Sequence, residues 1–153
     1  IGRNCEIREG AYIRGNVYVG DNSVVGHCSE VKNSILLSGA KAPHFNYVGD
    51  SILGHKVNLG AGTKISNLKI INESTVKVSI DGKVYDTGLR KLGAIIGDDS
   101  ETGCNSVLNP GSIIGKEVLI YPNVAVRGYI PDRSIVKFKP VLEIVDRKNY
   151  QAF

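Results

Sequence analysis

Residues 13–31 read IRGNVYVGDNSVVGHCSEV, in which an aliphatic residue stands at every sixth position from Ile13 to Val31. The same spacing extends in both directions and returns after two interruptions. The lead positions are Ile1, Ile7, Ile13, Val19, Val25, Val31 and Leu37, then Leu53, Leu59 and Ile65, then Ile96, Thr102, Leu108, Ile114, Ile120 and Val126. Of these 16 positions 15 are Ile, Val or Leu, which fill only 44 of the 153 positions overall. The period of six is therefore not a chance pattern.

A period of six fits neither an α-helix nor simple strand alternation, and it is typical of a parallel β-helix. Three hexads, about 18 residues, close one triangular coil with the lead side chain inside. Gly often follows the lead, and we expect it to permit a turn with positive φ. We therefore predict an all-β, single-stranded, left-handed parallel β-helix. The left hand is carried over from the hexapeptide-repeat proteins that the pattern resembles, because the general crossover rule predicts the opposite hand. The alternative is a sandwich of short strands.

Two interruptions break the period. The step from Leu37 to Leu53 is not a multiple of six, which predicts a loop or bulge around Lys41–Asp50 that carries His44. Residues 71–95 fall outside the coil, and their alternating pattern predicts a protruding β-hairpin with a type I′ turn at Asp81-Gly82.

The expected organisation is a β-helix domain over residues 1–127, with the insertion at 71–95, followed by a C-terminal arm over residues 128–153. We expect Ser134–Val145 to extend over the last coil and cover its open edge. The chain contains no Met, so we treat Ile1 as a cut end of a longer protein.

Composition narrows the possible partners. The net charge is +4, from 19 basic and 15 acidic residues that are scattered along the chain, which favours anionic small molecules over nucleic acid. Every apolar run is much shorter than the ~18 residues of a membrane span, so we expect no membrane partner. The odd number of cysteines, three without C-x-x-C spacing, argues against disulfides and a structural zinc site and favours the cytoplasm.

Four motifs carry a resemblance to a known family. They are Ser29–Asn33, Lys41–Asp50 (KAPHFNYVGD), Val57–Thr63 (VNLGAGT) and Ser66-Asn67. With these motifs the chain resembles the acetyltransferase domain of the bifunctional glucosamine-1-phosphate acetyltransferase / N-acetylglucosamine-1-phosphate uridyltransferase family. The hairpin and residues 87–94 (TGLRKLGA) are more similar to the archaeal-type sugar-1-phosphate nucleotidylyltransferases.

The resemblance implies a function and a set of site residues. It implies N-acetylation of a hexosamine 1-phosphate by acetyl-CoA, in the biosynthesis of UDP-N-acetylglucosamine, with no metal needed for acetyl transfer. His44 would be the general base, since imidazole accepts a proton near neutral pH, and Asn67 would support the oxyanion. Sugar and phosphate contacts would be Arg14, Lys32, Tyr47, Asn58 and Lys77, with Lys91 as the alternative to Lys77.

Arg14 and Lys32 are separated by the length of one full coil, so the spacing itself predicts that they stack one coil apart, about 4.8 Å in the ladder direction. Two stacked cations repel unless an anion lies between them. The predicted acetyl-CoA contacts, Cys104 and Pro122, have the same separation. Both depart from the family pattern, because Cys104 stands where Ser is usual and Pro122 has no backbone N–H to donate.

Three readings remain at this point. The first is the acetyltransferase, acting as a homotrimer because neighbouring subunits complete each site in this family. The second is a non-catalytic trimerisation or regulatory module of a sugar-1-phosphate nucleotidylyltransferase. The third, a zinc enzyme of the γ-carbonic anhydrase type, needs three clustered histidines, and the spacing of His27, His44 and His55 does not favour it.

Overall fold

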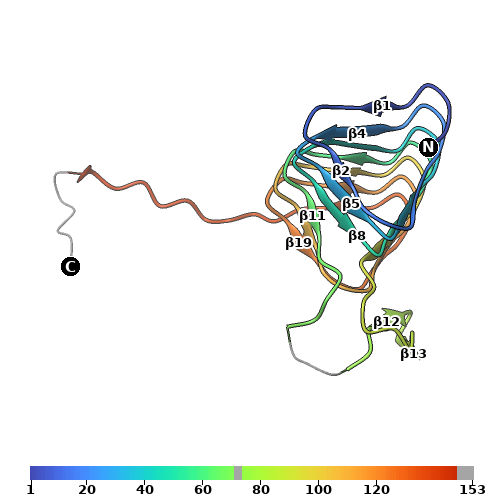
Figure 1. Ribbon diagram of the computed structural model, residues 1–153. Coiled ribbons are helices and arrows are strands. Elements are labelled where there is room, and N and C mark those ends of the chain that lie inside the picture. Colours follow the sequence, from blue (N-terminus) through green and yellow to red (C-terminus); the bar gives the residue numbers. More distant parts are fainter. Residues whose placement is uncertain (71–73, 148–153) are drawn as a thin grey trace.

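The chain forms a left-handed parallel β-helix of triangular cross-section (Figure 1). The computed structural model describes residues 1–70 and 74–147. Each coil gives one strand to each of three parallel sheets, and an antiparallel two-stranded hairpin protrudes from the body. The predicted fold class is confirmed. No helix within these ranges has the length and apolarity that crossing a membrane requires.

The three sheets form the faces of a prism. Sheet A contains β1 (Glu6–Ile7), β4 (Val24–His27), β7 (Lys41–His44), β10 (Asn58–Leu59), β15 (Glu101–Thr102), β18 (Leu119–Ile120) and β21 (Ile135–Val136). Sheet B contains β2 (Tyr12–Ile13), β5 (Glu30–Lys32), β8 (Tyr47–Gly49), β11 (Lys64–Ile65), β16 (Val107–Leu108) and β19 (Ala125–Val126). Sheet C contains β3 (Val17–Val19), β6 (Ser34–Leu36), β9 (Ile52–Leu53), β14 (Ala94–Ile96), β17 (Ser112–Ile114) and β20 (Tyr129–Ile130). We call the corners where the chain passes between sheets the A/B, B/C and C/A edges.

The interior holds the lead side chain of each coil strand, and some strands turn a second, smaller side chain inward, as β6 does with Ser34 beside Leu36. Val19, Val25 and Val31 are fully buried, and each such side chain contributes about 1.5–3 kcal/mol. Small polar residues four positions after a lead are buried too, because their hydroxyls bond to carbonyls of an adjacent turn. Ser23 Oγ, for example, donates to the Leu37 carbonyl at 3.2 Å. These serine and threonine hydroxyls thus give hydrogen-bond donors to backbone carbonyls at the corners, which would otherwise be buried without a partner.

The predicted loop around residues 41–50 is wrong. Lys41–His44 is β7, and β8 follows at Tyr47, so the chain stays on the coil. The coils here are one residue shorter than three hexads, since Val25 pairs with Ala42 and Leu36 pairs with Leu53. The steps from Val31 to Leu36 and from Val48 to Leu53 are one residue short, so Leu36 rather than Leu37 fills the core.

The expected role of the glycines after the lead residues is also wrong. Gly20 and Gly26 do not have positive φ, whereas Asn22 and Cys28, two residues further on, have φ of 59° and 51°. The glycines are needed because the next coil comes too close. A Cβ on Gly26 would lie 1.7 Å from the Pro43 carbonyl oxygen.

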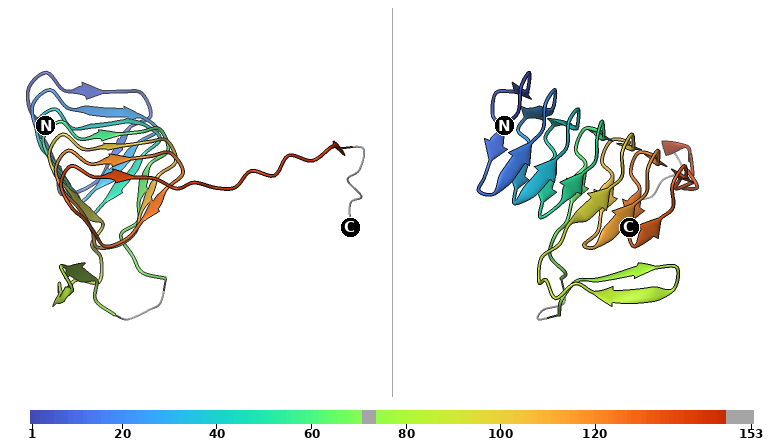
Figure 2. Two further views of the ribbon diagram at one scale, coloured as in Figure 1. Left: turned by 180° about the vertical axis from the view of Figure 1, so that it is seen from behind. Right: turned by 90° about the vertical axis from the view of Figure 1, so that its right-hand side faces the viewer.

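The predicted hairpin is confirmed. β12 (Lys77–Ile80) pairs antiparallel with β13 (Lys83–Asp86), and Asp81 and Gly82 both have positive φ, as a type I′ turn requires. The hairpin projects below the prism (Figure 2), while Val76 at its root is buried against Gly111. The start of the predicted insertion, residues 71–73, lies outside the described residues, and the chain is back on the coil at β14.

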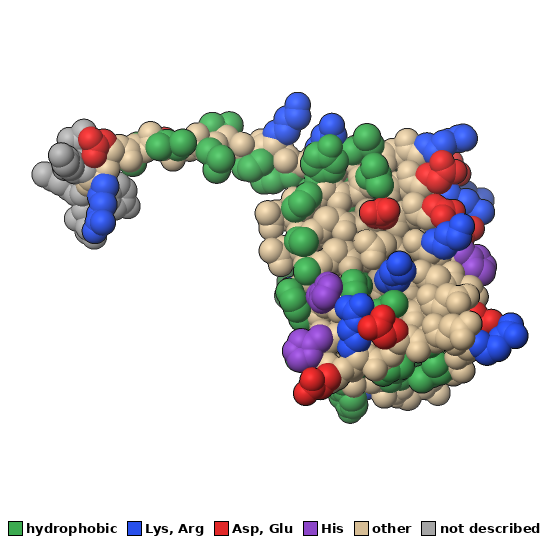
Figure 3. Space-filling view, turned by 90° about the horizontal axis from the view of Figure 1, so that it is seen from above, with side chains coloured by type: hydrophobic (Ala, Val, Ile, Leu, Met, Phe, Trp, Pro, Cys, Tyr) green, Lys and Arg blue, Asp and Glu red, His purple; other side chains and the backbone are tan. Residues whose placement is uncertain are grey.

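The C-terminal segment differs from the expected covering arm. The coil continues past residue 127 through β20 and β21, where the pairing of Ile114 with Ile130 closes a coil shorter than three hexads and so hides the period. Beyond Val136 the chain leaves the prism and extends away from it (Figure 1), so it does not cover the last coil. Its apolar side chains lie exposed along the arm (Figure 3). Residues 148–153 of the predicted arm lie outside the described residues.

We expect Gly26→Ala to destabilise the fold by roughly 1–3 kcal/mol, because the added methyl forces adjacent coils apart. Gly15→Ala is the matched control, since a Cβ there meets no atom within 4 Å. Thermal unfolding should show a lower Tm for Gly26→Ala and a near-normal Tm for Gly15→Ala. Equal Tm values for the two variants would contradict the close-approach explanation.

Candidate active site

One row of residues follows the A/B edge through successive coils. Corner hydrogen bonds fix the row: the Phe45 amide donates to the His27 carbonyl at 2.8 Å, and the Gly62 amide donates to the His44 carbonyl at 3.0 Å. The same pattern continues along the edge, where the Asn105 amide donates to the Ala61 carbonyl and the Asn123 amide donates to the Cys104 carbonyl. The row therefore reads His27, His44, Ala61, Cys104 and Pro122. The structure brings His44 into line with the two predicted coenzyme contacts, two coils or about 10 Å from Cys104.

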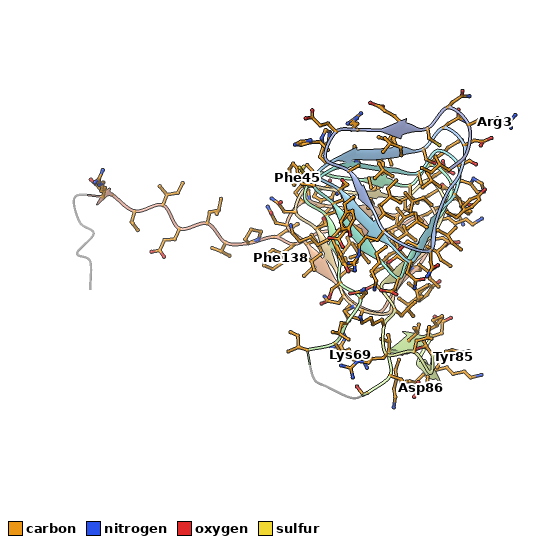
Figure 4. The ribbon with its side chains drawn as sticks, in the orientation of Figure 1. Arg3, Phe45, Lys69, Tyr85, Asp86 and Phe138 are labelled. Atoms are coloured by element: carbon orange, nitrogen blue, oxygen red, sulfur yellow. The ribbon has the colours of Figure 1, made fainter. Side chains whose placement is uncertain are left out.

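The backbone at His44 is held by a buried amide. Asn46, 2% exposed, accepts a hydrogen bond from the His44 amide at 3.0 Å and donates to the Gly60 carbonyl at 2.8 Å. The His44 imidazole itself is exposed, with the Phe45 ring beside it at a centroid distance of 6.5 Å. Figure 4 shows Phe45 at this edge, with Phe138 further along it where the chain leaves the last coil. A fixed backbone and an open imidazole suit proton transfer to a bound molecule.

Arg14 and Lys32 stack on the B/C edge, as their spacing predicted. The Arg14 amide donates to the Val31 carbonyl at 2.8 Å, which places the two cationic residues in adjacent coils. Their charges are balanced by acids of this chain, because Arg14 pairs with Glu30 at 2.8 Å and Lys32 pairs with Asp50 at 3.4 Å.

Asp50 is the residue that joins this group, and sequence reasoning gave it no role. It accepts hydrogen bonds from the amide of Asn33 at 2.7 Å, from the amide of Asn67 and from the ammonium of Lys32. Partial burial raises the pKa of Asp50, but the bonds from Asn33 and Asn67 and the charge of Lys32 outweigh it and hold the pKa below its usual value. The sequence does contain a sign of this group. Asn33, Asp50 and Asn67 are equally spaced along the chain, and their spacing matches the length of the short coils, so the three residues stack.

Lys91, rather than Lys77, lies near this group. Lys91 lines a cleft of about 310 Å³ at the B/C edge together with Asn33 and Asp50. Lys77 lies on the hairpin strand β12 with an exposed side chain, and it does not line this cleft.

Tyr47 and Asn58 lie on different faces of the prism. Tyr47 is on sheet B between Glu30 and Lys64, whereas Asn58 is on sheet A between Lys41 and Glu101. One chain therefore spreads the predicted site residues over two edges, two faces and, for Lys77, the hairpin.

Sequence reasoning also missed a second hollow at the B/C edge. Its volume is about 390 Å³, and it is lined by Ser66, Leu68, Lys69, Ile70, Asn109, Pro110 and Arg127. Lys69 lies at the base of the insertion, below the prism (Figure 4). Arg127 follows the lead residue Val126, as Arg14 follows Ile13, so the cations recur in one row. Two cations and no acid line this hollow, which suits an anionic group.

The residues do not form an obvious metal site. Within residues 1–70 and 74–147, no three His, Cys, Asp or Glu side chains gather closely enough to hold a metal ion. The zinc-enzyme reading therefore gains no support from the arrangement of the described side chains.

Comparison with known proteins gives a family and a fold. Residues 1–88 match the family described as GMPPB C-terminal domain. The chain is 43% identical over 116 residues to a bifunctional sugar-1-phosphate nucleotidylyltransferase/acetyltransferase of Sulfurisphaera tokodaii, covering 76% of this chain and 29% of that protein. It is 41% identical over 139 residues to the bifunctional protein GlmU of Methanococcus maripaludis, covering 91% of this chain and 33% of that protein. The chain thus spans about a third of the length of these relatives.

Solved structures share the fold at low sequence identity. A variant of the N-acyltransferase AntD from Bacillus cereus, in complex with dTDP and coenzyme A, superposes with a TM-score of 0.69 at 18% identity, over 97% of this chain and 83% of that one. The acetyltransferase domain of PglB from Neisseria gonorrhoeae, in complex with acetyl coenzyme A, superposes with a TM-score of 0.67 at 19% identity, over 86% of this chain and 53% of that one. At this level of identity the two structures show similarity of fold alone.

We expect Asp50→Asn to lower the free energy of unfolding at neutral pH and to make it depend less on pH in the acid range. Because the folded pKa of Asp50 is depressed, its carboxylate stabilises the fold fully above about pH 4, the unfolded value, and this contribution is lost as pH falls through the folded pKa. Urea unfolding from pH 7 to pH 2 measures the difference. Asp99→Asn, at a side chain 55% exposed, is the control. Identical pH curves for Asp50→Asn and wild type would refute the role of Asp50.

Proposed function

The chain belongs to the GMPPB C-terminal domain family, and from that premise we propose that it is an acetyl-CoA-dependent N-acetyltransferase acting on a hexosamine 1-phosphate. Glucosamine 1-phosphate is the first candidate, as a step toward UDP-N-acetylglucosamine. The observation that supports this most is the A/B row, in which an exposed imidazole at His44 stands in line with Cys104 and Pro122. The names of the relatives from Sulfurisphaera and Methanococcus agree with it.

The proposed reaction is direct transfer. The neutral His44 imidazole takes a proton from the 2-amino group, whose nitrogen attacks the thioester carbonyl of acetyl-CoA. The tetrahedral intermediate carries an oxyanion, which the N–H of Asn67 that Asp50 does not use would stabilise. Because Asn67 lies with Asp50 at the B/C edge and His44 lies at the A/B edge, the two residues would come from neighbouring copies of the chain. The C–S bond then breaks, coenzyme A leaves as the thiolate, and it takes up the proton. The products are the N-acetylated sugar phosphate and free coenzyme A.

Sugar-phosphate binding is assigned to the B/C edge. The phosphate would replace Glu30 and Asp50 as the partner of Arg14 and Lys32, so the site exchanges one anion for another instead of holding two bare cations. Lys91 completes this group in preference to Lys77, because Lys91 lines the cleft beside Asp50. Tyr47, on the sheet between the two edges, would contact the sugar.

The proposed enzyme is a homotrimer. Asn58 lies on sheet A, away from Tyr47 on sheet B, so a neighbouring copy must face this chain if both are to contact one substrate. The coenzyme would lie along the A/B edge, past Cys104 and Pro122. The three unpaired cysteines suit the reducing cytoplasm, where we place the protein.

A non-catalytic trimerisation or regulatory module remains the second candidate. One observation favours it: Pro122 cannot donate a backbone hydrogen bond at the proposed coenzyme edge. The activity assays below separate the two functions.

We expect His44→Ala to lower kcat by about 10²- to 10⁴-fold, the usual contribution of a positioned base. Release of the coenzyme A thiol should be followed with glucosamine 1-phosphate, galactosamine 1-phosphate and acetyl-CoA. The acid limb of kcat/KM against pH should disappear in the variant. His55→Ala, which changes another exposed histidine, is the control and should keep wild-type rates.

Two results would reject the mechanism. One is full activity in His44→Ala. The other is absence of thiol release by the folded wild-type chain with both sugar phosphates, which would place the module function first. Far-UV circular dichroism and Tm must match between wild type and variant for either comparison.

We expect Arg14→Ala and Lys32→Ala to raise KM for the sugar phosphate by roughly 10- to 100-fold, and to change KM for acetyl-CoA much less. Lys116→Ala is the control, because Lys116 pairs with Asp98 at the C/A edge, away from the proposed site. Equal effects on both substrates would refute the phosphate assignment.

A further inference from the structure

The carboxylate of Asp50 connects the predicted phosphate ligand Lys32 to the predicted oxyanion donor Asn67. The Asp50 side chain is only 10% exposed, and its two oxygens have different partners. Oδ1 accepts a hydrogen bond from the Asn33 amide at 2.7 Å. Oδ2 accepts both from the Asn67 amide and from the Lys32 ammonium, the latter at 3.4 Å. Lys32 and Asn67 therefore compete for one oxygen of the same carboxylate.

The backbone around this carboxylate is fixed. The Asp50 amide donates to the Lys32 carbonyl at 3.0 Å, and the Asp50 carbonyl accepts from the Gly93 amide at 2.8 Å. The Asn67 carbonyl accepts from the Leu92 amide at 3.0 Å. The adjacent coil and the returning end of the insertion thus hold the main chain, so rearrangement within this group is left to side-chain rotation.

The carboxylate also decides which way the Asn67 amide faces. An ionised carboxylate only accepts hydrogen bonds, so Asn67 must turn its NH₂ group toward Asp50. One N–H then bonds to Asp50, and the second is left for a ligand. An amide turned the other way would present its carbonyl oxygen, which repels an oxyanion instead of stabilising it.

The Asn67 amide lies beside the hydroxyl of Tyr47, the predicted sugar contact. A Cβ on Gly49 would lie 2.8 Å from the Asn67 amide nitrogen and 2.7 Å from the Tyr47 hydroxyl oxygen. The two polar groups therefore come together over a residue that has no side chain. A sugar held by Tyr47 would lie within reach of the Asn67 amide.

We propose, on the basis of the function proposed above, that Asp50 is a positioning residue for acetyl transfer, which holds an N–H of Asn67 toward the reacting carbonyl once a phosphate has taken Lys32. The phosphate draws the ammonium away from Oδ2 and leaves that oxygen to Asn67 alone. The bond from Asn67 to a carboxylate is charge-assisted, so it then holds the amide in one orientation. Asp50 itself makes no contact with the substrate.

One substrate can reach both ends of this network. Lys32 and Asn67 lie on either side of Asp50, two coils or about 10 Å apart. The phosphate and the amino group of a hexosamine 1-phosphate are on adjacent ring carbons, so the phosphate can bind Lys32 while the reacting nitrogen faces Asn67. Binding of the phosphate thus prepares the oxyanion donor for the same molecule.

A double-mutant cycle on kcat tests the path from Asp50 to Asn67. Asp50→Asn lets the Asn67 amide turn over, so kcat should fall by about 10- to 100-fold, whereas Asn67→Ala should lower it by roughly 10²- to 10³-fold, the usual effect of removing an oxyanion donor. The double variant should be no slower than Asn67→Ala, because no amide is left to position. Losses that multiply in the double variant would overturn the proposal.

Substrate binding separates positioning from a general structural effect. Asp50→Asn removes a carboxylate that competes with the phosphate for Lys32, so KM for glucosamine 1-phosphate should not rise. Isothermal titration with glucosamine 1-phosphate, without acetyl-CoA, makes the same comparison independently of the chemical step. A loss of affinity as large as that of Lys32→Ala would show that Asp50 only maintains the phosphate site, and the positioning role would then be rejected.

Asp98→Asn is the matched control. Asp98 is another corner carboxylate, which accepts from the His55 amide at 2.8 Å and pairs with Lys116 at 3.1 Å, but it lies at the C/A edge. This variant loses a similar set of bonds and should keep the wild-type kcat. Circular dichroism and Tm must show that every variant is folded at the assay temperature.

Asn33→Gly provides a second variant in case Asp50→Asn does not fold. It removes the bond to Oδ1 and keeps the charge of Asp50, and glycine readily adopts the φ of 46° at this position. We expect kcat to fall several-fold in the wild-type background and to stay unchanged in the Asn67→Ala background. An equal fall in both backgrounds would also contradict the positioning role.

Failure of the positioning role can be told from failure of the acetyltransferase reaction. Thiol release by wild type, together with losses that multiply in the double variant, rejects the role of Asp50 alone. Absence of thiol release by the folded wild-type protein rejects the reaction itself, and with it any role of Asp50 in acetyl transfer.

Discussion

The backbone hydrogen bonds between successive coils determine the rest of this structure. They bring each coil to the spacing of neighbouring strands, so equivalent residues stack in rows along the prism. Corners must then lack side chains wherever the next coil touches them, and glycine meets this need at Gly26 against Pro43. The lead side chain of each strand then fills the interior, so the sequence repeats with a period of about six.

Rows also explain how such a simple fold can carry chemistry. Residues far apart in the chain, such as His44 and Cys104, come into line because both lie at the A/B edge, two coils apart. On the B/C edge the same stacking gathers Arg14 and Lys32, and it would be unfavourable without the carboxylates of Glu30 and Asp50. Asp50 links one of these cations to the amide of Asn67, so a single carboxylate joins residues from three successive coils.

The departures from the coil have separate physical reasons. The hairpin folds locally, with Asp81-Gly82 as its turn, and Val76 at its root is buried against Gly111. The arm has no such anchor among the described residues, and Val141 and Ile144 are almost fully exposed. Sheet C differs again, because its exposed residues are ordered by the coil into one apolar row.

The sequence by itself determined the fold class, the hairpin and the stacking of Arg14 on Lys32, since periodicity and turn chemistry are local properties. It predicted a loop at His44 where the structure has a strand. Two corners are one residue short and shift the phase of the six-residue period, and the adjacent leucines Leu36 and Leu37 hide the first of these shifts in the sequence. It also gave no sign that Asp50 bonds to Asn33, Asn67 and Lys32, or that Lys91 lines the cleft beside Asp50. Only the tertiary structure decided these points, because they depend on which residues different coils place side by side, and that depends on the exact length of every coil between them.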